Sequence, residues 1–294
     1  MYIVTGAAGF IGSNLIRAMN ERGLTDILAV DCLTKGMKFR NLRGLSIADY
    51  LDLDEFLDAL ERNTLGTVEG ILHQGACADT MEEDGRYMMA ANFGCSKKIL
   101  HYAAPRGIPM VYASSASVYG CNRDSAEVAS NEHPLNVYAY SKWLFDQYVA
   151  RHRSELRATV VGLRYFNVYG PNEAQKGRMA SMVYQLYRQL KEKGVCRLFE
   201  GTDGFGNGEQ ARDFVSADDV ANVNLHFLLG NPAHGVFNVG TGTARTFNDI
   251  ARTLISGLGG GTVEYIPFPQ NLRGKYQNYT RADLTRLRAA FLAH

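Results

Sequence analysis

The sequence predicts an α/β protein built around a doubly wound, parallel β-sheet. Three observations lead to this fold class. A glycine-rich turn follows the first apolar run, the first half alternates short apolar runs with longer amphipathic stretches, and this alternation ends near residue 163. Short aliphatic runs bounded by turn residues are typical of strands buried on both faces. The predicted strands are Tyr2–Thr5, Asp26–Val30, Gly70–His73, Pro109–Ala113 and Ala158–Leu163.

Amphipathic stretches separate these strands, and we expect them to cover both faces of the sheet as helices. The predicted helices of the first half are Ile11–Arg22, Asp54–Asn63, Gly85–Ala104 and Tyr138–His152. Beyond residue 163 the pattern predicts a smaller, mixed α/β C-terminal lobe. Its predicted elements are a loop over 164–175, helices over Met179–Lys193 and Asp218–Leu229, a glycine-rich loop over Phe205–Gln210 and strands at Gly235–Val239 and through Tyr265.

Composition narrows the class of protein further. The 294 residues are 46% hydrophobic with a formal net charge of +1, so the chain can bury a large core but lacks the clustered positive charge that nucleic-acid binding needs. The five cysteines show no metal-ligand spacing, which predicts reduced thiols, no metal and a cytoplasmic protein. The apolar run at residues 2–4 leaves no room for a signal peptide, and no run approaches the roughly 20 residues of a membrane span.

The glycine-rich turn lies between the first predicted strand and the first predicted helix. Gly6, Gly9 and Gly12 have the spacing GxxGxxG, a variant of the dinucleotide-binding fingerprint of Rossmann-type domains. The first glycine allows a tight turn, the second lets the backbone approach a pyrophosphate, and the third lets the helix pack closely on the sheet. Asp31 ends the second strand about 20 residues later, where the fingerprint expects an acidic residue. The sequence therefore predicts a bound nicotinamide dinucleotide.

The residues after the second strand leave the identity of this dinucleotide open. Asp31 favours the free 2′-hydroxyl of NAD, whereas a nearby cation can hold the 2′-phosphate of NADP. Four basic residues follow: Lys35, Lys38, Arg40 and Arg43. They are equally typical of a solvated surface loop. The sequence alone does not decide between NAD and NADP.

Hydroxyl groups gather just after the fourth predicted strand, in the segment Ser114–Gly120. Ligands of a doubly wound sheet bind beyond the C-terminal strand ends, so Ser115 is placed to bind a substrate hydroxyl. Tyr138 and Lys142 follow at a spacing of four, which puts both on one face of a helix. A nearby ammonium lowers the pKa of a phenol, so Tyr138 can remove a hydroxyl proton while Lys142 holds the nicotinamide ribose. Tyr140 would face elsewhere and is expected to be a packing residue.

These elements, in this order, resemble the extended short-chain dehydrogenase/reductase family, of the NAD-dependent epimerase/dehydratase type. The segments GPNEAQKG (170–177) and IPFPQNLRGKYQ (266–277) are similar to those of family members that epimerise an ADP-heptose. The resemblance implies an isomerase that inverts C6 of the heptose, from ADP-D-glycero-D-manno-heptose to ADP-L-glycero-D-manno-heptose, through a transient 6-keto intermediate with tightly bound NADP. It also implies a role in lipopolysaccharide core precursor synthesis and a homo-oligomer, commonly a pentamer.

The resemblance implies roles for individual residues. Inversion needs proton transfer on two faces of one carbon, and Lys176 would be the second acid/base beside the catalytic Ser115, Tyr138 and Lys142. The cofactor would be bound by Gly6, Gly9, Phe10, Ile11, Gly12, Asp31, Cys32, Lys38, Gln74, Gly75, Ala76, Cys77, Asn92, Lys142, Val168 and Lys176. The ADP-sugar would be bound by Ser115, Asn167, Arg178, Gln185, Phe199, Glu200, Gly201, Thr202, Arg212 and Tyr276. Residues 1–168 plus about 213–240 would form the NADP-binding domain, and 169–212 plus 241–294 the substrate-binding lobe.

The chain departs from the family pattern at several positions. Leu53 stands where members carry a lysine near the cofactor phosphate, Arg178 where a small serine is common, and Gln185 where a histidine stands. An insertion near 206–209 lengthens the loop before Arg212. The sequence also ends before a final helix that members usually have, which predicts a less stable substrate-binding lobe.

Alternative functions stay open, two of them enzymatic and one not. A UDP-hexose 4-epimerase shares the Ser–Tyr–Lys set, and a sugar 4,6-dehydratase would need an Asp-Glu pair where this chain has Ser115-Ala116-Ser117. Outside enzymes, a redox-sensing or regulatory binding module would keep the glycine turn and lose the tyrosine or the lysine, and both are present here.

Overall fold

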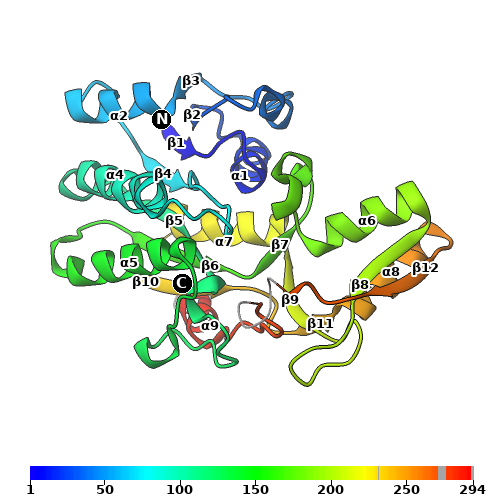
Figure 1. The fold of residues 1–294 in the computed structure, drawn as a ribbon. Helices are drawn as coiled ribbons and strands as arrows, with labels where there is room; N and C mark the ends of the chain where they lie inside the picture. The colour runs from blue at the N-terminus through cyan, green and yellow to red at the C-terminus, as the bar shows by residue number, and fades with distance from the viewer. Residues whose placement is uncertain (231, 271–275, 293–294) are drawn as a thin grey trace.

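A seven-stranded, parallel sheet forms the centre of the molecule in the computed structural model, which describes residues 1–230, 232–270 and 276–292 (Figure 1). In spatial order its strands are β10 (His234–Val239), β6 (Val160–Tyr165), β5 (Met110–Ser115), β4 (Gly70–His73), β1 (Tyr2–Thr5), β2 (Ile27–Asp31) and β3 (Asp49–Asp52). The chain builds outward from β1 to β3 and then returns to add β4 on the other side. This reversal leaves a crevice at the C-terminal strand ends. The predicted Rossmann-type, doubly wound fold class is confirmed.

Helices cover both faces of the sheet because successive strand residues point to opposite sides. In β1, for example, Ile3 belongs to the core on one face and Val4 to the core on the other. The first face is covered by α2 (Leu53–Arg62), α4 (Cys95–Ala103) and α5 (Val137–Arg151), and the second by α1 (Phe10–Asn20), α7 (Ala217–Leu229) and α9 (Thr285–Leu292). In the described ranges, none of the helices has the length and apolar character that a bilayer crossing requires.

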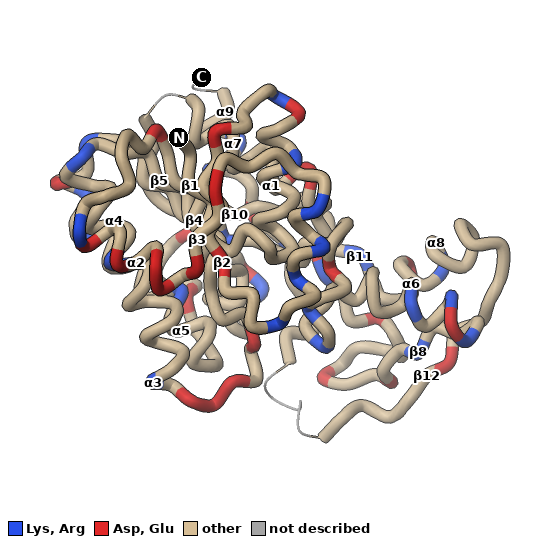
Figure 2. Tube along the Cα trace, turned by 90° about the horizontal axis from the view of Figure 1, so that it is seen from above, with Lys and Arg blue, Asp and Glu red and all other residues tan. Residues whose placement is uncertain are grey.

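A smaller lobe of mixed α/β structure extends to one side of the sheet (Figures 1 and 2). It contains a three-stranded sheet of β7 (Asn167–Tyr169), β9 (Ala211–Ser216) and β11 (Ala244–Thr246), and a parallel pair of β8 (Val195–Phe199) and β12 (Thr262–Ile266). Helices α6 (Met182–Lys193) and α8 (Phe247–Leu258) pack on these strands around a separate apolar core. The exact division of the chain into two domains stays a prediction.

The main disagreement with the sequence prediction concerns residues 164–175, which were expected to form a loop. Arg164 and Tyr165 complete β6, Asn167–Tyr169 form β7, and Glu173–Met179 form a short 3-10 helix, η7. All six residues of β6 are buried. The prediction was wrong for two reasons. The Asn, Gly and Pro residues of the segment favoured a loop, and a charged residue such as arginine is rarely found inside a buried strand.

Other elements differ in number and in their ends. The helix predicted over Gly85–Ala104 is divided into α3 (Gly85–Met88), a π-helical turn, η2 (Met89–Gly94), and α4. The short polar strands β3, β9 and β11, and β8 with its exposed Arg197, are absent from the prediction because their charged residues hide the alternation of a half-buried strand. Several predicted ends shift by one to three residues; the helix expected from Met179, for instance, begins at Met182.

The contact between β5 and β6 depends on a glycine. Gly162 is the partner of Tyr112 in the parallel register of these strands. A Cβ atom added at Gly162 would lie 2.5 Å from the Tyr112 ring, which is far inside van der Waals contact. The ring therefore lies flat across Gly162, and this places the Tyr112 hydroxyl 3.1 Å from Asp146 of α5.

We predict that Gly162→Ala lowers the free energy of unfolding by about 1–3 kcal/mol, the usual cost of overpacking a core. Gly257→Ala is the matched control because Gly257 lies in α8 with nothing within 4 Å of an added Cβ. It should be neutral or stabilising by up to about 1 kcal/mol, since alanine favours a helix. Urea denaturation of both variants measures the effects, and equal stabilities would contradict the proposed packing.

Candidate active site

The glycine turn brings two loops at the C-terminal edge of the sheet into close contact. Gly6 has a φ of +65°, and an added Cβ would lie 2.8 Å from the amide nitrogen of Gly75, in the loop after β4. An added Cβ at Gly12 would lie 2.1 Å from the Gly6 carbonyl oxygen. Both positions therefore exclude a side chain. At Gly6 a side chain would separate the two loops, and at Gly12 it would push α1 away from the turn. The turn lies at the reversal of strand order, where a dinucleotide is expected.

The N-terminus of α1 is open towards this crevice. Its cap residue, Gly9, has no side chain to accept from the first backbone N–H groups. In contrast, α2, α5, α6, α7 and α8 are each capped by a side chain, namely Asp52, Asn136, Ser181, Ser216 and Thr246. The uncapped N–H groups and the positive end of the helix dipole suit a pyrophosphate. The residues at this turn therefore fit a dinucleotide.

Asp31, at the end of β2, holds the turn from the other side. Its carboxylate accepts hydrogen bonds from the amides of Ala8 (2.8 Å) and Cys32 (2.7 Å) and forms an ion pair with Lys38 of η1 (Gly36–Asn41). Its side chain is almost fully buried. Leu53, the departure from the family pattern, opens α2 and packs with the core on that face. The Asp31 carboxylate is thus largely occupied by protein groups, one of which is a cation.

A buried chain of hydrogen bonds joins the two cofactor loops, and the sequence analysis did not identify it. The Thr5 hydroxyl accepts from the Gly75 amide (3.0 Å) and lies 2.7 Å from Nδ1 of His73. Nε2 of His73 then donates to Ser96 (2.8 Å), whose hydroxyl donates to the Asn92 carbonyl (2.5 Å). Burial lowers the pKa of His73 to about 3, so the ring is neutral. These directions assign the proton of His73 to Nε2.

Asn92 extends this connection to helix α5. Its side chain bonds the backbone N–H and C=O of Cys77 (2.8 and 3.0 Å) and the Ser141 hydroxyl (3.0 Å). It lies in the π-helical turn η2, a form that is frequent at functional sites. Gln74, at the start of the same loop, accepts from the Tyr165 hydroxyl (3.0 Å). The side chains of Gln74 and Asn92 thus shape the loop that carries Gly75, Ala76 and Cys77.

The predicted catalytic hydroxyls meet between β5 and α5. Ser115 ends β5, and its hydroxyl accepts from the hydroxyl of Ser117 (2.9 Å) in η4 (Ala116–Tyr119). Tyr138 lies in the first turn of α5, with its phenol close enough to the Ser115 hydroxyl to be influenced by it. Burial raises the pKa of the Tyr138 phenol and the Ser115 hydroxyl opposes this. The direction is opposite to the expected effect of Lys142, so the phenol is protonated in this state.

Lys142 reaches back from α5 to the end of β5. Its ammonium donates to the Ala113 carbonyl oxygen (2.9 Å), and the side chain is 8% exposed. Burial lowers the pKa of Lys142 to about 8, and the Asp146 carboxylate opposes this shift. Tyr140, in contrast, is 43% exposed and its ring lies near Trp143. Tyr138 and Lys142 therefore share the inward face of the helix, as their spacing predicts.

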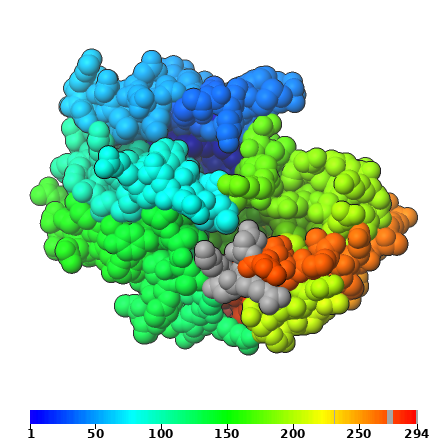
Figure 3. Space-filling view, in the orientation of Figure 1, coloured from blue at the N-terminus to red at the C-terminus, as the bar shows by residue number. Residues whose placement is uncertain are grey.

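Lys176 approaches the glycine turn from the segment after β7. It lies in η7, and its ammonium is 5.3 Å from the centre of the Phe10 ring, the first residue of α1. Burial lowers the pKa of Lys176, and Glu173 opposes this shift. Glu173 itself is buried and accepts from the amides of Gly170 (2.9 Å) and Ser181 (2.6 Å), which fixes the segment. Figure 3 shows the surface hollowed where this yellow-green segment faces the dark-blue N-terminal turn.

Arg178 and Gln185, two other departures, lie near Lys176 with different partners. Arg178 is exposed and forms an ion pair (2.6 Å) with Asp79, which lies in the loop after β4. Gln185 donates to the carbonyl oxygens of Ala180 (2.7 Å) and Arg178 (3.3 Å). Gln185 therefore holds the end of this segment in place, and Arg178 links it to the large sheet.

The predicted sugar-binding residues gather in the smaller lobe around a buried arginine. Arg212 of β9 lies 4.9 Å from the centre of the Tyr276 ring and is 7% exposed. Burial lowers its pKa, and Tyr276 opposes this. Phe199, at the end of β8, and Phe268 pack edge-on against Tyr276, and the sequence analysis missed Phe268. A buried guanidinium beside three aromatic rings suits a flat, anionic ligand.

The remaining predicted residues lie around these groups. Asn167 of β7 donates to the Thr280 hydroxyl (3.2 Å), and Val168 packs on the core beside α1. Glu200, Gly201 and Thr202 follow β8; the Gly201 amide donates to Asn207 (2.9 Å), within the inserted loop. Residues 271–275 of the second family-like segment lie outside the described residues. In the described ranges, no cluster of His, Cys, Asp and Glu side chains has an arrangement that could hold a metal ion.

Comparison with known proteins identifies the class. The profile of the NAD dependent epimerase/dehydratase family matches residues 2–240. The chain belongs to this family.

Individual relatives are more specific. The chain is 54% identical over 291 residues to ADP-L-glycero-D-manno-heptose-6-epimerase of Alkalilimnicola ehrlichii, covering 99% of this chain and 91% of the relative. The solved ADP-L-glycero-D-manno-heptose-6-epimerase of Helicobacter pylori is similar with a TM-score of 0.85 and 34% identity, over 97% of this chain and 88% of that one. Thermus thermophilus UDP-glucose 4-epimerase, solved with NAD, has a TM-score of 0.80 and 26% identity, over 99% and 92%.

Proposed function

We propose that this protein is an ADP-heptose 6-epimerase, which converts ADP-D-glycero-D-manno-heptose to ADP-L-glycero-D-manno-heptose through a 6-keto intermediate. The high identity to a curated epimerase of this name supports the substrate. The observation that carries the reaction type is the position of Lys176 against Phe10 of the dinucleotide turn. A dehydrogenase needs one acid/base, whereas this arrangement brings a second proton-transfer group to the C-terminal end of the sheet, in addition to Tyr138 of α5.

Tyr138 is the first acid/base in this proposal. The glycine turn and Lys142 would hold a nicotinamide dinucleotide, which would supply the reversible hydride transfer at C6. Ser115 orients the C6 hydroxyl, and Tyr138 accepts its proton as the carbonyl forms. Burial favours the neutral phenol. In this proposal the positive charge of Lys142, four residues further along the same helix, opposes that effect and favours proton acceptance. Lys142 is charged below its pKa of about 8 and loses this charge above it.

Lys176 is the second acid/base. Returning the hydride to the other face of the keto carbon needs a proton donor on the opposite side of the substrate. Burial lowers the pKa of Lys176 and thereby makes proton exchange near neutral pH easier than for a solvated lysine. Its contact with the Phe10 ring positions the ammonium, and Glu173 fixes the η7 segment that carries it. Arg212 is placed to bind the diphosphate, since a guanidinium can contact it with two parallel hydrogen bonds.

We propose NADP as the cofactor. Three residues support this choice: the Asp31 carboxylate is occupied by backbone amides and neutralised by Lys38, and Arg40 stands exposed in the same η1 segment. A carboxylate in this state repels a 2′-phosphate less than a free one. The homo-oligomer and the cytoplasmic location expected from the sequence stay predictions.

The substrate is tested by incubating the pure protein with ADP-D-glycero-D-manno-heptose and, separately, with UDP-glucose. We expect inversion at C6 of the heptose, followed by NMR, and no change at C4 of the glucose. Tyr138→Phe should lower kcat by about 10²–10⁴-fold because it removes the acid/base. Tyr140→Phe is the control and should retain activity. Turnover of UDP-glucose alone would overturn the proposed substrate.

The role of Lys176 is tested with Lys176→Met. We expect at least a hundredfold loss of epimerisation, in keeping with the loss of an acid/base, and little change in the dissociation constant of NADP. Lys193→Met, at the exposed end of α6, is the control. If the Lys176 variant lost NADP binding to the same extent as activity, a binding role would replace the proposed catalytic one.

The cofactor is tested on protein that has been freed of nucleotide. Calorimetric titration should give at least tenfold tighter binding of NADP than of NAD, and Lys38→Ala should reduce that preference. The reduction follows because Asp31 regains an unpaired negative charge beside the 2′-phosphate. Equal affinity for the two dinucleotides in the unchanged protein would contradict the proposal.

A further inference from the structure

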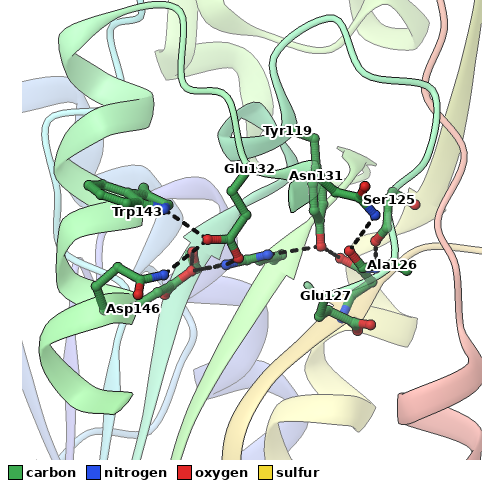
Figure 4. A network of polar contacts seen from close by, with 12 residues as sticks. Tyr119, Ser125, Ala126, Glu127, Asn131, Glu132, Trp143 and Asp146 are labelled. Atoms are coloured by element: carbon green, nitrogen blue, oxygen red, sulfur yellow. Dashed lines mark hydrogen bonds and ion pairs between the residues drawn. The ribbon is translucent and has the colours of Figure 1, made fainter. Parts of the chain in front are cut away.

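A buried cluster of charges lies directly behind α5, the catalytic helix that carries Tyr138 and Lys142 (Figure 4). Arg164 of β6 is fully buried, with Asp146 of α5 on one side of its guanidinium and Glu132 on the other (3.0 and 2.6 Å). The Tyr119 hydroxyl accepts from the same guanidinium (3.0 Å). Glu132 also accepts from Trp143 (2.8 Å). No step of the proposed reaction uses this cluster, although burying such charges is costly.

The Asp146 carboxylate is ionised, and its partners show this. It accepts from the hydroxyls of Tyr112 (3.1 Å) and Ser114 (2.9 Å) and from Nε of Arg164 (3.0 Å). Nη2 of Arg164 lies 3.0 Å from the same carboxylate in an ion pair. All of these groups donate, so the oxygens act only as acceptors. Burial raises the pKa of Asp146, and Arg164, Ser114 and Tyr112 oppose this.

Asp146 and Lys142 attach helix α5 to consecutive residues of strand β5. Lys142 donates to the Ala113 carbonyl oxygen, and Asp146 accepts from the Ser114 hydroxyl. The next residue along the strand is Ser115, whose hydroxyl faces the Tyr138 phenol of the same helix and lowers its pKa. The bonds of Lys142 and Asp146 therefore fix the position of α5 along the direction of β5. They also fix the distance between the catalytic hydroxyls at the ends of these elements.

The charges of the cluster do not balance without Lys142. Two carboxylates face one guanidinium, which leaves one negative charge in excess in a buried place. Lys142 precedes Asp146 by four residues, so the two side chains are neighbours on one face of α5. The other titratable groups near Lys142 are His73 of β4, which is neutral, the thiols of Cys77 and Cys95, and the Tyr138 phenol.

We propose that Asp146 is a positioning residue that fixes α5 against β5 and, as the buried counter-ion of Lys142, keeps this lysine protonated. Arg164 orients the carboxylate and prevents it from taking up a proton. Glu132 serves a different purpose: it holds Arg164 and the loop before α5. The inference deepens the proposed function, because it explains how a buried lysine remains charged where the reaction needs it.

The pH dependence of kcat tests the electrostatic part. Activity should fall as pH rises through the pKa of Lys142, about 8. Asp146→Asn removes the negative charge and should move this alkaline limb down by about one pH unit, the shift typical of losing a close opposite charge. Asp146→Glu keeps the negative charge beside Lys142, and Glu132→Gln removes a carboxylate that is further from Lys142. Each of these two variants should shift the alkaline limb by less than half the shift seen in Asp146→Asn. Equal shifts in all three variants, or none, would overturn the proposal.

A folding experiment tests the same pair without substrate or cofactor. The effect of Asp146→Asn on the folding equilibrium constant is measured by urea denaturation in the unchanged protein and in Lys142→Met. At pH 7 we expect the loss to be at least about fivefold smaller in the Lys142→Met background, because the ammonium is then absent. The difference should vanish as the pH rises through about 8, the pKa of Lys142 in the folded protein, because the ammonium is then neutral. Additive effects at pH 7 would exclude a direct interaction.

The two experiments separate this inference from the proposed function. If the protein did not act on ADP-heptose, the kinetic comparison would fail for every variant, but the folding coupling would still be present. If Asp146→Asn is unfolded in buffer, all variants are compared in an osmolyte that stabilises the folded state equally. A coupling without a shift of the alkaline limb would retain the positioning role and overturn the counter-ion role.

Discussion

The close approach of the turn after β1 to the loop after β4 is the constraint on which the site depends. It is possible only because Gly6 has no side chain where its backbone meets Gly75. The Thr5 hydroxyl and the neutral His73 ring then join the two loops on the side away from the crevice. Asn92 and Lys176 approach the crevice from other elements and are positioned against this pair of loops.

Two further connections transmit that geometry to the chemistry. Asn92 fastens the loop after β4 to Ser141, in the middle of the catalytic helix, and Phe10 provides the surface on which Lys176 rests. The smaller lobe supplies a separate binding surface, in which a buried arginine faces aromatic rings. The large sheet thus determines where protons move, and the smaller lobe determines which molecule is held there.

The sequence predicted the parts of this arrangement that follow from local chemistry. Glycine spacing located the turn, and the spacing of Tyr138 and Lys142 gave their common face. It did not predict β9, because a strand with a buried Arg212 has no recognisable alternation. It gave the wrong direction for the pKa of Tyr138, since the burial of a side chain is set by residues distant in sequence. Likewise, His73 and Asp146 show no motif; their importance is visible only once β4, β5 and α5 are side by side.

The π-helical turn at Met89–Gly94 has a consequence for how this region can vary. A π turn holds one residue more than an α-helical turn, and this extra residue directs Asn92 towards Cys77 while the following α4 keeps its apolar side on the sheet. Removing a single residue there would rotate either Asn92 away from Cys77 or the apolar side of α4 away from the sheet, by about 100°. Substituting one residue in this segment therefore disturbs the local structure less than inserting or deleting one. The number of residues between β4 and α4 is therefore as important to the site as their identity.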